Sequence, residues 1–283
     1  MNKIWIVARM TFREAIRRRI VLTGLILGIF FLIIFSIGFH MIYAAMHENA
    51  ARVQNAISRI AQAEASSFLM LAGLYATAFL CVAMGALLSA DTLAGEITSG
   101  TIQTIVTKPL RRADVVLGKW LGFAGLLGLY FLLMSGGVVL SVMVQSGYVP
   151  RGMMPGLSLI YLEALLIMTV SLACSSAMPG LATGGVVFGL YGLAFLGGWI
   201  EQIGTLLNNQ TAVKIGIVTS LIIPTEALWR RAAFEMQSPV IASLRITPFS
   251  TVSVPSVLMV VYAVFYLILA LAAAVNTFQH RDI

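Results

Sequence analysis

The sequence predicts an all-α integral membrane protein with six transmembrane helices. Of its 283 residues, 59% are hydrophobic and only 10% are charged, whereas soluble domains carry about 25% charged residues. Six runs are apolar over at least the roughly 20 residues that a helix needs to cross a bilayer. None of these runs alternates apolar and polar residues, as the strands of a membrane β-barrel do. We expect one transmembrane domain over 1–283, with spans at 20–45, 66–90, 120–146, 157–177, 181–200 and 252–278.

The segment before the first span, 1–19, mixes apolar and basic side chains. Trp5 and Phe12 alternate with Arg9 and Arg13. This pattern is typical of an amphipathic helix in the membrane interface, where arginines meet anionic headgroups. A basic flank that only fixes the orientation is the alternative interpretation. The apolar run 20–45 is far longer than the roughly 7–15 residues of a signal-peptide core, so we expect it to be retained.

The basic residues indicate the orientation of the chain. Eleven Lys and Arg residues fall in 1–19, in 91–119 and in the tail, and seven fall on the opposite side. Cytoplasmic loops carry the excess of Lys and Arg, which predicts that both termini are cytoplasmic. The net charge of +7 does not predict nucleic-acid binding, because the cations form short clusters between apolar runs.

The connection 91–119 after the second span predicts a short cytoplasmic helical hairpin. Ile97, Ile102 and Ile105 give it an apolar stripe, and Pro109 ends it. Such a helix can rest on its own membrane or fit a groove on a cytoplasmic partner. It is no ATP site. A phosphate-binding loop around Gly118 and Lys119 would need glycine at position 113 and a hydroxyl at position 120, where the chain has alanine and tryptophan.

Four segments together resemble a known family. They are 6–14 (IVARMTFRE), 91–119 with GE at 95–96, SGTI at 99–102 and KPLRR at 108–112, 223–230 (IPTEALWR) and 278–282 (FQHRD). With the order of the spans, they resemble the permease subunits of type-2 ABC transporters. The similarity is greatest to the six-span branch that includes the nitrous-oxide-reductase maturation permeases.

This resemblance implies that the hairpin is a coupling helix that docks into a separate cytoplasmic ATPase. The chain would then be the permease of an ATP-driven exporter in a prokaryotic plasma (inner) membrane, not an enzyme. It would bind no cofactor itself, because ATP and magnesium would sit on two copies of the ATPase. The other partners would be membrane lipids and a second copy of the chain, with a heterodimer of permeases left open. The implied coupling residues are Glu96, Gly100, Thr101, Ile102, Lys108 and Pro109.

Three further groups have two interpretations each. Glu163 lies inside the fourth span, where a carboxylate marks a transport pathway or makes a structural hydrogen bond. The glycines of the fifth span, including Gly185 and Gly189, suit either a dimer seam beside the pathway, as the resemblance implies, or packing within one subunit. A cluster at the outer end of the first span suits copper by its chemistry or simple packing; it consists of His40, Met41, Met46 and His47.

The segment 201–251 is expected to lie on the outer side without spanning. Its apolar run 211–223 is too short to cross, and Pro224 and an amphipathic stretch follow. We therefore predict a re-entrant or interfacial segment that caps the translocation path. The leading function is export of an unidentified hydrophobic or amphipathic cargo. An ion-coupled secondary transporter is the alternative, and the chain lacks the motifs of a zinc peptidase or serine hydrolase.

Overall fold

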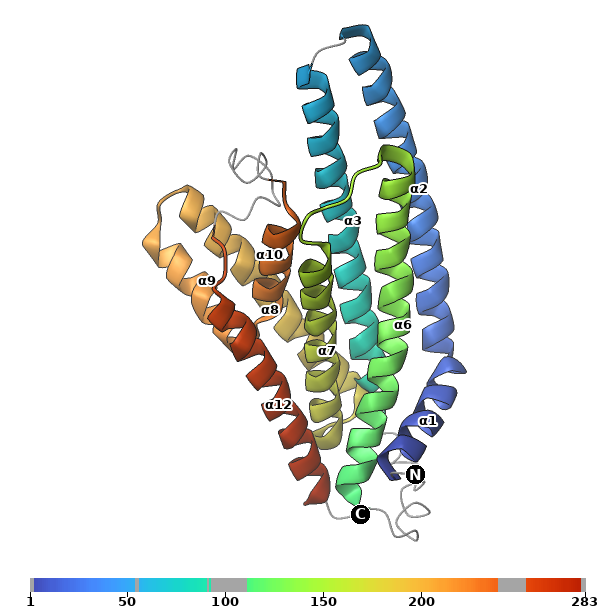
Figure 1. Cartoon of the computed structure of the whole chain (residues 1–283). Helices are drawn as coiled ribbons and strands as arrows, with labels where there is room; N and C mark the ends of the chain where they lie inside the picture. The colour runs from blue at the N-terminus through green and yellow to red at the C-terminus, as the bar shows by residue number, and fades with distance from the viewer. Residues whose placement is uncertain (1–2, 54–55, 91, 93–110, 239–252, 281–283) are drawn as a thin grey trace.

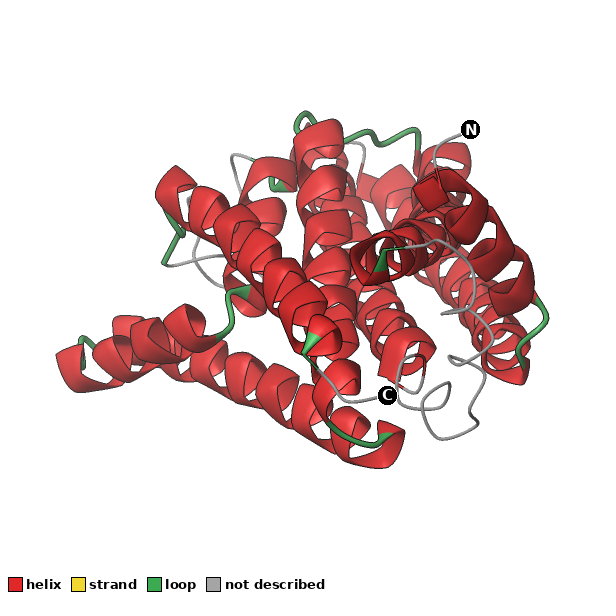
Figure 2. Cartoon of the chain, turned by 90° about the horizontal axis from the view of Figure 1, so that it is seen from below, coloured by secondary structure: helices red, strands yellow, loops and turns green. Residues whose placement is uncertain are grey.

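The computed structural model describes residues 3–53, 56–90, 92, 111–238 and 253–280. Within these ranges every regular element is a helix, which confirms the all-α prediction (Figures 1 and 2). The helices are α1 (Lys3–Ile16), α2 (Arg19–Val53), α3 (Ala56–Ala90), α6 (Arg112–Ser146), α7 (Met153–Ala177), α8 (Gly180–Leu206), α9 (Gln210–Ile222), α10 (Thr225–Met236) and α12 (Val257–Gln279).

Six of these helices are long and apolar enough to cross a membrane, as predicted. They are α2, α3, α6, α7, α8 and α12. Figure 1 shows α1, the start of α6 and the end of α12 at one end of the bundle, and the end of α2 and the start of α3 at the other. With both ends of the chain at the same end of the bundle, an even number of crossings connects them.

Five helices, α2, α3, α6, α7 and α8, extend beyond their predicted spans. Helix α2 continues past residue 45 to Val53, α3 begins at Ala56 and not at residue 66, and α7 begins at Met153 and not at residue 157. The third span was expected to start at Trp120, but α6 begins at Arg112 and is continuous from there. The segment 112–119 is therefore the first two turns of a spanning helix and not part of a hairpin. Likewise, α8 continues past Ile200 to Leu206. Apolar length marks the hydrocarbon layer, whereas a helix can continue into the headgroup region, where charged side chains reach water.

Helix α1 packs against the first turns of α6, and two glycines make this contact possible. A Cβ atom on Gly118 would lie 2.6 Å from the Cβ atom of Val7, and one on Gly122 would lie 2.7 Å from the backbone oxygen of Ala8. Ala8 and Thr11 are buried at this contact. The small residues thus let two helices approach at backbone distance.

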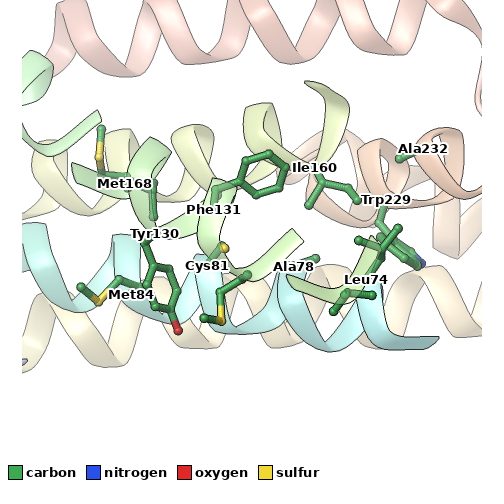
Figure 3. Packing of buried hydrophobic residues seen from close by; sticks show 14 of the residues in the cluster. Leu74, Ala78, Cys81, Met84, Tyr130, Phe131, Ile160, Met168, Trp229 and Ala232 are labelled. Carbon is green, nitrogen blue, oxygen red and sulfur yellow. The ribbon is translucent and has the colours of Figure 1, made fainter. Parts of the chain in front are cut away.

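The core lies between α3, α6 and α7 (Figure 3). On α3, Leu74, Ala78, Cys81 and Met84 follow a helical spacing along one face. In the most apolar 18-residue stretch of each helix, 61% of the α3 residues and 56% of the α7 residues are buried, whereas only 11% are buried in α2 and in α12. The outer helices therefore turn most of their apolar surface towards lipid.

The segment after α8 folds back on the bundle. Helices α9 and α10 are bent by 105° relative to each other, and Pro224, which cannot donate a backbone hydrogen bond, precedes α10. Helix α9 packs closely along α8, with Thr219 against Gly197 and Glu201 against Gly216. Nine of the twelve residues of α10 are buried. A bent pair of this kind is the form of a re-entrant loop or of a broken span.

Candidate functional site

A groove of about 700 Å³ opens between α2, α3 and α8. Seven of its thirteen lining residues are phenylalanine or tyrosine, and none is charged. Large apolar pockets with few polar groups are typical sites for hydrophobic ligands. The lining residues are Leu27, Phe30, Phe31, Ile34, Ala72, Tyr75, Ala76, Phe79, Leu80, Phe188, Tyr191, Gly192 and Phe195. Their contribution from three separate helices could not be recognised in the sequence.

The glycines of α8 divide into two groups. Towards its C-terminal end, Gly197 is packed against Thr219 and Gly198 against Glu226, so these positions serve packing within the subunit. Towards its N-terminal end, a Cβ atom on Gly185 or Gly189 would meet nothing within 4 Å, and the same holds for Gly184 and Gly192. Because Gly192 also lines the groove, this open glycine face borders it.

A buried ion pair joins α8 to α10. Arg230 is 1% exposed and Glu201 is 4% exposed. The guanidinium approaches both carboxylate oxygens, with Nη1–Oε1 and Nη2–Oε2 distances of 2.8 Å. Ser253 Oγ donates to Glu201 Oε1 at 2.7 Å. Of the two contacts between Arg230 and Glu201, Nη2–Oε2 is a charge-assisted hydrogen bond, whereas Nη1 has no hydrogen-bond partner among the described residues. The ion pair joins α10 to the bundle.

Two further carboxyls lie beside this pair. Glu163 on α7 is 1% exposed, and its Oε2 atom has no hydrogen-bond partner among the described residues. Glu226 on α10 is 4% exposed and interacts electrostatically with Glu163. Glu226 also interacts electrostatically with Arg230 and Glu201. The sequence analysis did not single out Glu226 as a site residue, although it did identify the segment 223–230 that contains it.

The residues of the predicted coupling hairpin lie outside the described residues. This applies to Glu96, Gly100, Thr101, Ile102, Lys108 and Pro109. The helix ends on either side of the hairpin are described, and they are tied to their neighbours. Arg18 Nη1 donates to Thr92 Oγ1 at 3.4 Å, just after α3, and Arg112 Nη1 donates to the backbone oxygen of Gln279 on α12 at 2.9 Å.

The predicted interfacial residues occupy different faces of α1. Trp5 is 63% exposed, and Arg9 and Arg13 are also exposed. Phe12 is half-buried against α6 near Gly125. An exposed tryptophan on a helix with exposed arginines fits the membrane interface, where its amphipathic ring is favoured.

The histidines at the outer end of α2 have separate neighbours. His40 Nδ1 lies 3.2 Å from Gln145 Oε1 on α6, and His47 Nδ1 lies 3.4 Å from Gln62 Nε2 on α3. Met41 and Met46 are exposed. No group of three His, Cys, Asp or Glu residues suited to a metal occurs in the described part of the chain.

A family comparison decides the class of the protein. Residues 5–283 match the family model described as ABC-2 family transporter protein. The chain belongs to this family. It is therefore a membrane permease component of an ABC transporter and not itself catalytic, and the family generally works with an ATP-binding cassette ATPase. No curated protein matches this sequence.

Proposed function

We propose that this ABC-2 permease exports a hydrophobic or amphipathic cargo through a homodimer that is driven by two cytoplasmic ATPase subunits. The observation that carries the proposal is the aromatic groove between α2, α3 and α8. A pocket with this lining supplies apolar contact area and no charge to hold a small ion. ATP and magnesium bind to the ATPase, and this chain supplies the path.

The open glycine face of α8 supports the homodimer. Gly184, Gly185, Gly189 and Gly192 have free space beside them, whereas Gly197 and Gly198 are already packed within the subunit. In lipid, small residues favour helix association because two backbones can approach closely. A second copy on this face would place two grooves on either side of the seam.

The inner end of the bundle supports transmission of force from the ATPase. The proposed coupling residues Glu96, Gly100, Thr101 and Ile102 precede α6, and Lys108–Pro109 close the hairpin. Since α6 holds α1 through Gly118 and Gly122 and contacts α12 through Arg112, a displacement of α6 acts on both helices. Nucleotide would thereby shift the permease between inward-open and outward-open states.

The arrangement of the spans and the basic residues also supports a location and an orientation in the membrane. Six crossings, with α1 and the end of α12 at the same end of the bundle, and eleven basic residues on that side support cytoplasmic termini. The six spans and the motif at 91–119 also support a place in the six-span branch with the nitrous-oxide-reductase maturation permeases. We assign the protein to the prokaryotic inner membrane.

An ion-coupled secondary transporter is the second candidate, favoured by the buried carboxyl of Glu163. Membership of the ABC-2 family weighs against it, because that family works with an ATPase.

Reconstitution separates the two candidates. The permease and the ATP-binding cassette ATPase that co-purifies with it are placed in proteoliposomes, and ATP turnover and transport of a lipophilic dye are measured. Under the proposal, transport requires ATP. Glu96→Ala then retains ATP turnover but loses most transport, because the partner contact is weakened. The control, Glu48→Ala, changes an exposed glutamate at the outer end of α2. Transport driven by an ion gradient alone, or full transport by Glu96→Ala, would refute the proposal.

A further inference from the structure

The buried polar cluster between α7, α8 and α10 has more negative than positive groups. Three carboxyls, those of Glu163, Glu201 and Glu226, and one guanidinium, that of Arg230, are each at most 4% exposed. Burying an ionised carboxylate without a partner is strongly unfavourable, so such groups are paired or neutralised. One cation cannot neutralise three carboxylates.

The geometry shows which carboxyl takes the cation. Glu201 binds Arg230 through both oxygens at 2.8 Å and also accepts from Ser253. Its charge is therefore balanced. Glu163 and Glu226 face each other electrostatically, and Glu163 Oε2 has no hydrogen-bond partner among the described residues.

Among the described residues, no other cation faces the two carboxyls from the surrounding helices. The titratable neighbours are Tyr75 and Cys81 on α3 and Tyr191 on α8, all neutral when protonated. On α12, Tyr262 donates to the backbone oxygen of Leu221, and Tyr266 interacts with Tyr262 and Cys174. On α6, Tyr130 donates to the backbone oxygen of Gly24.

The nearest lysine on α6 lies at another depth. Trp120 Nε1 donates to Thr169 Oγ1, so this turn of α6 lies level with Thr169. Thr169 is six residues beyond Glu163 on α7, which corresponds to roughly 9 Å along the helix axis. Lys119 therefore lies more than a turn closer to the inner end than Glu163.

We propose that Glu163 and Glu226 form a proton-binding site beneath helix α10, in which at least one of the two carboxyls is protonated at neutral pH. The proton removes the excess charge. Glu163 lies ten residues into α7, about 15 Å along the axis, so the site is within the membrane-embedded part.

The site touches the groove and the helix that borders it. Tyr75 and Tyr191 interact electrostatically with Glu163 and also line the groove. The side chain of Glu226 lies against Gly198 of α8. A shift of α8 against α10 therefore changes the surroundings of the carboxyl pair, which links its proton to the state of the groove.

Infrared spectroscopy of the purified full-length permease in lipid nanodiscs tests the proposal without cargo or ATPase. Exposed glutamates, with a pKa of about 4.3, are ionised at neutral pH. We expect a carbonyl band of protonated carboxyl to remain there, to change in intensity or frequency in Glu163→Gln and in Glu226→Gln, and to disappear in the double variant, because a single buried carboxyl left without a cation still keeps its proton. Glu235→Gln, on the same helix α10 but paired with Arg231 near the surface, should leave the band unchanged. Absence of the band at neutral pH, or an unchanged band in both test variants, overturns the proposal.

Thermal unfolding against pH gives a second readout. A carboxyl that keeps its proton in the folded state makes the folded protein bind more protons than the unfolded one, so stability falls as pH rises from the acid range through neutrality. Glu163→Gln and Glu226→Gln should flatten this decline, and Glu235→Gln should retain it.

The infrared spectra are recorded with choline as the only buffer cation and are then repeated with sodium in place of choline. If sodium abolishes the band, the pair binds a metal cation in place of a proton and the proposal fails, whereas the export proposal stands.

Discussion

At the scale of single residues, the pair of Arg230 and Glu201 has the greatest consequence for stability. Both side chains are almost fully buried, and the guanidinium contacts both carboxylate oxygens. Removing one partner of such a pair leaves a buried charge without compensation, which costs far more than the pair contributes relative to apolar residues.

Arg230→Met should therefore destabilise the permease by about 3–5 kcal/mol, measured by unfolding in detergent. The double variant Arg230→Met with Glu201→Met should recover most of this loss, because neither partner is left as an unpaired buried charge. Arg231→Ala is the matched control: its pair with Glu235 is partly exposed and contributes about 0–1 kcal/mol. Equal losses for Arg230→Met and Arg231→Ala would contradict the assigned role.

The sequence did not predict which individual residues contact one another across the bundle. Glu163 was identified as a costly intramembrane acid, but its neighbour Glu226 is on a helix that returns to the bundle only after the chain bends at Pro224. The division of the α8 glycines into packed and open positions depends in the same way on where α9 lies. Such contacts follow from tertiary folding, which local patterns do not encode.

At the scale of elements, the contact of α1 with α6 depends on two small residues. The length of each apolar run predicted six helices, because the bilayer fixes that length, and Pro224 predicted a break in the segment before α12. For α1, the sequence predicted only a position in the membrane interface. Its contact with α6 could not be predicted, because it depends on Gly118 and Gly122 facing α1.

Gly122→Val should displace α1, because the new Cβ atom would lie within 2.7 Å of the backbone oxygen of Ala8. Overpacking of this kind costs about 1–3 kcal/mol. Trypsin cleavage at Arg9 and Arg13 should become faster, as followed by mass spectrometry. Gly136→Val on the same helix, where nothing lies within 4 Å, should cleave like the unmodified protein. Unchanged cleavage of Gly122→Val would show that α1 is held elsewhere.

At the scale of the whole molecule, the bundle has an inner core and an incomplete side. Helices α3 and α7 are covered by their neighbours, while the N-terminal half of α8 offers glycines with open space beside them. The homodimer proposed above would close this side.

Gly189→Cys should form a disulfide-linked dimer in membranes on mild oxidation, visible by electrophoresis without reductant. Helices that associate through small residues bring such positions close together. Gly136→Cys, an open position on α6 away from this face, should remain monomeric. A monomeric Gly189→Cys permease under the same oxidation would argue that α8 does not form the seam.

The unequal lengths of the helices have a further consequence. Helices α2, α3 and α6 have 35 residues each, whereas α7 has 25 and α12 has 23. At 1.5 Å per residue these correspond to about 52 Å, 37 Å and 35 Å. The long helices are longer than an ordinary bilayer is thick. The helices whose length is closest to the hydrocarbon thickness set by the lipid acyl chains are therefore α7 and α12. Thicker or thinner lipids should act first on these two helices, and both of them contact helix α10.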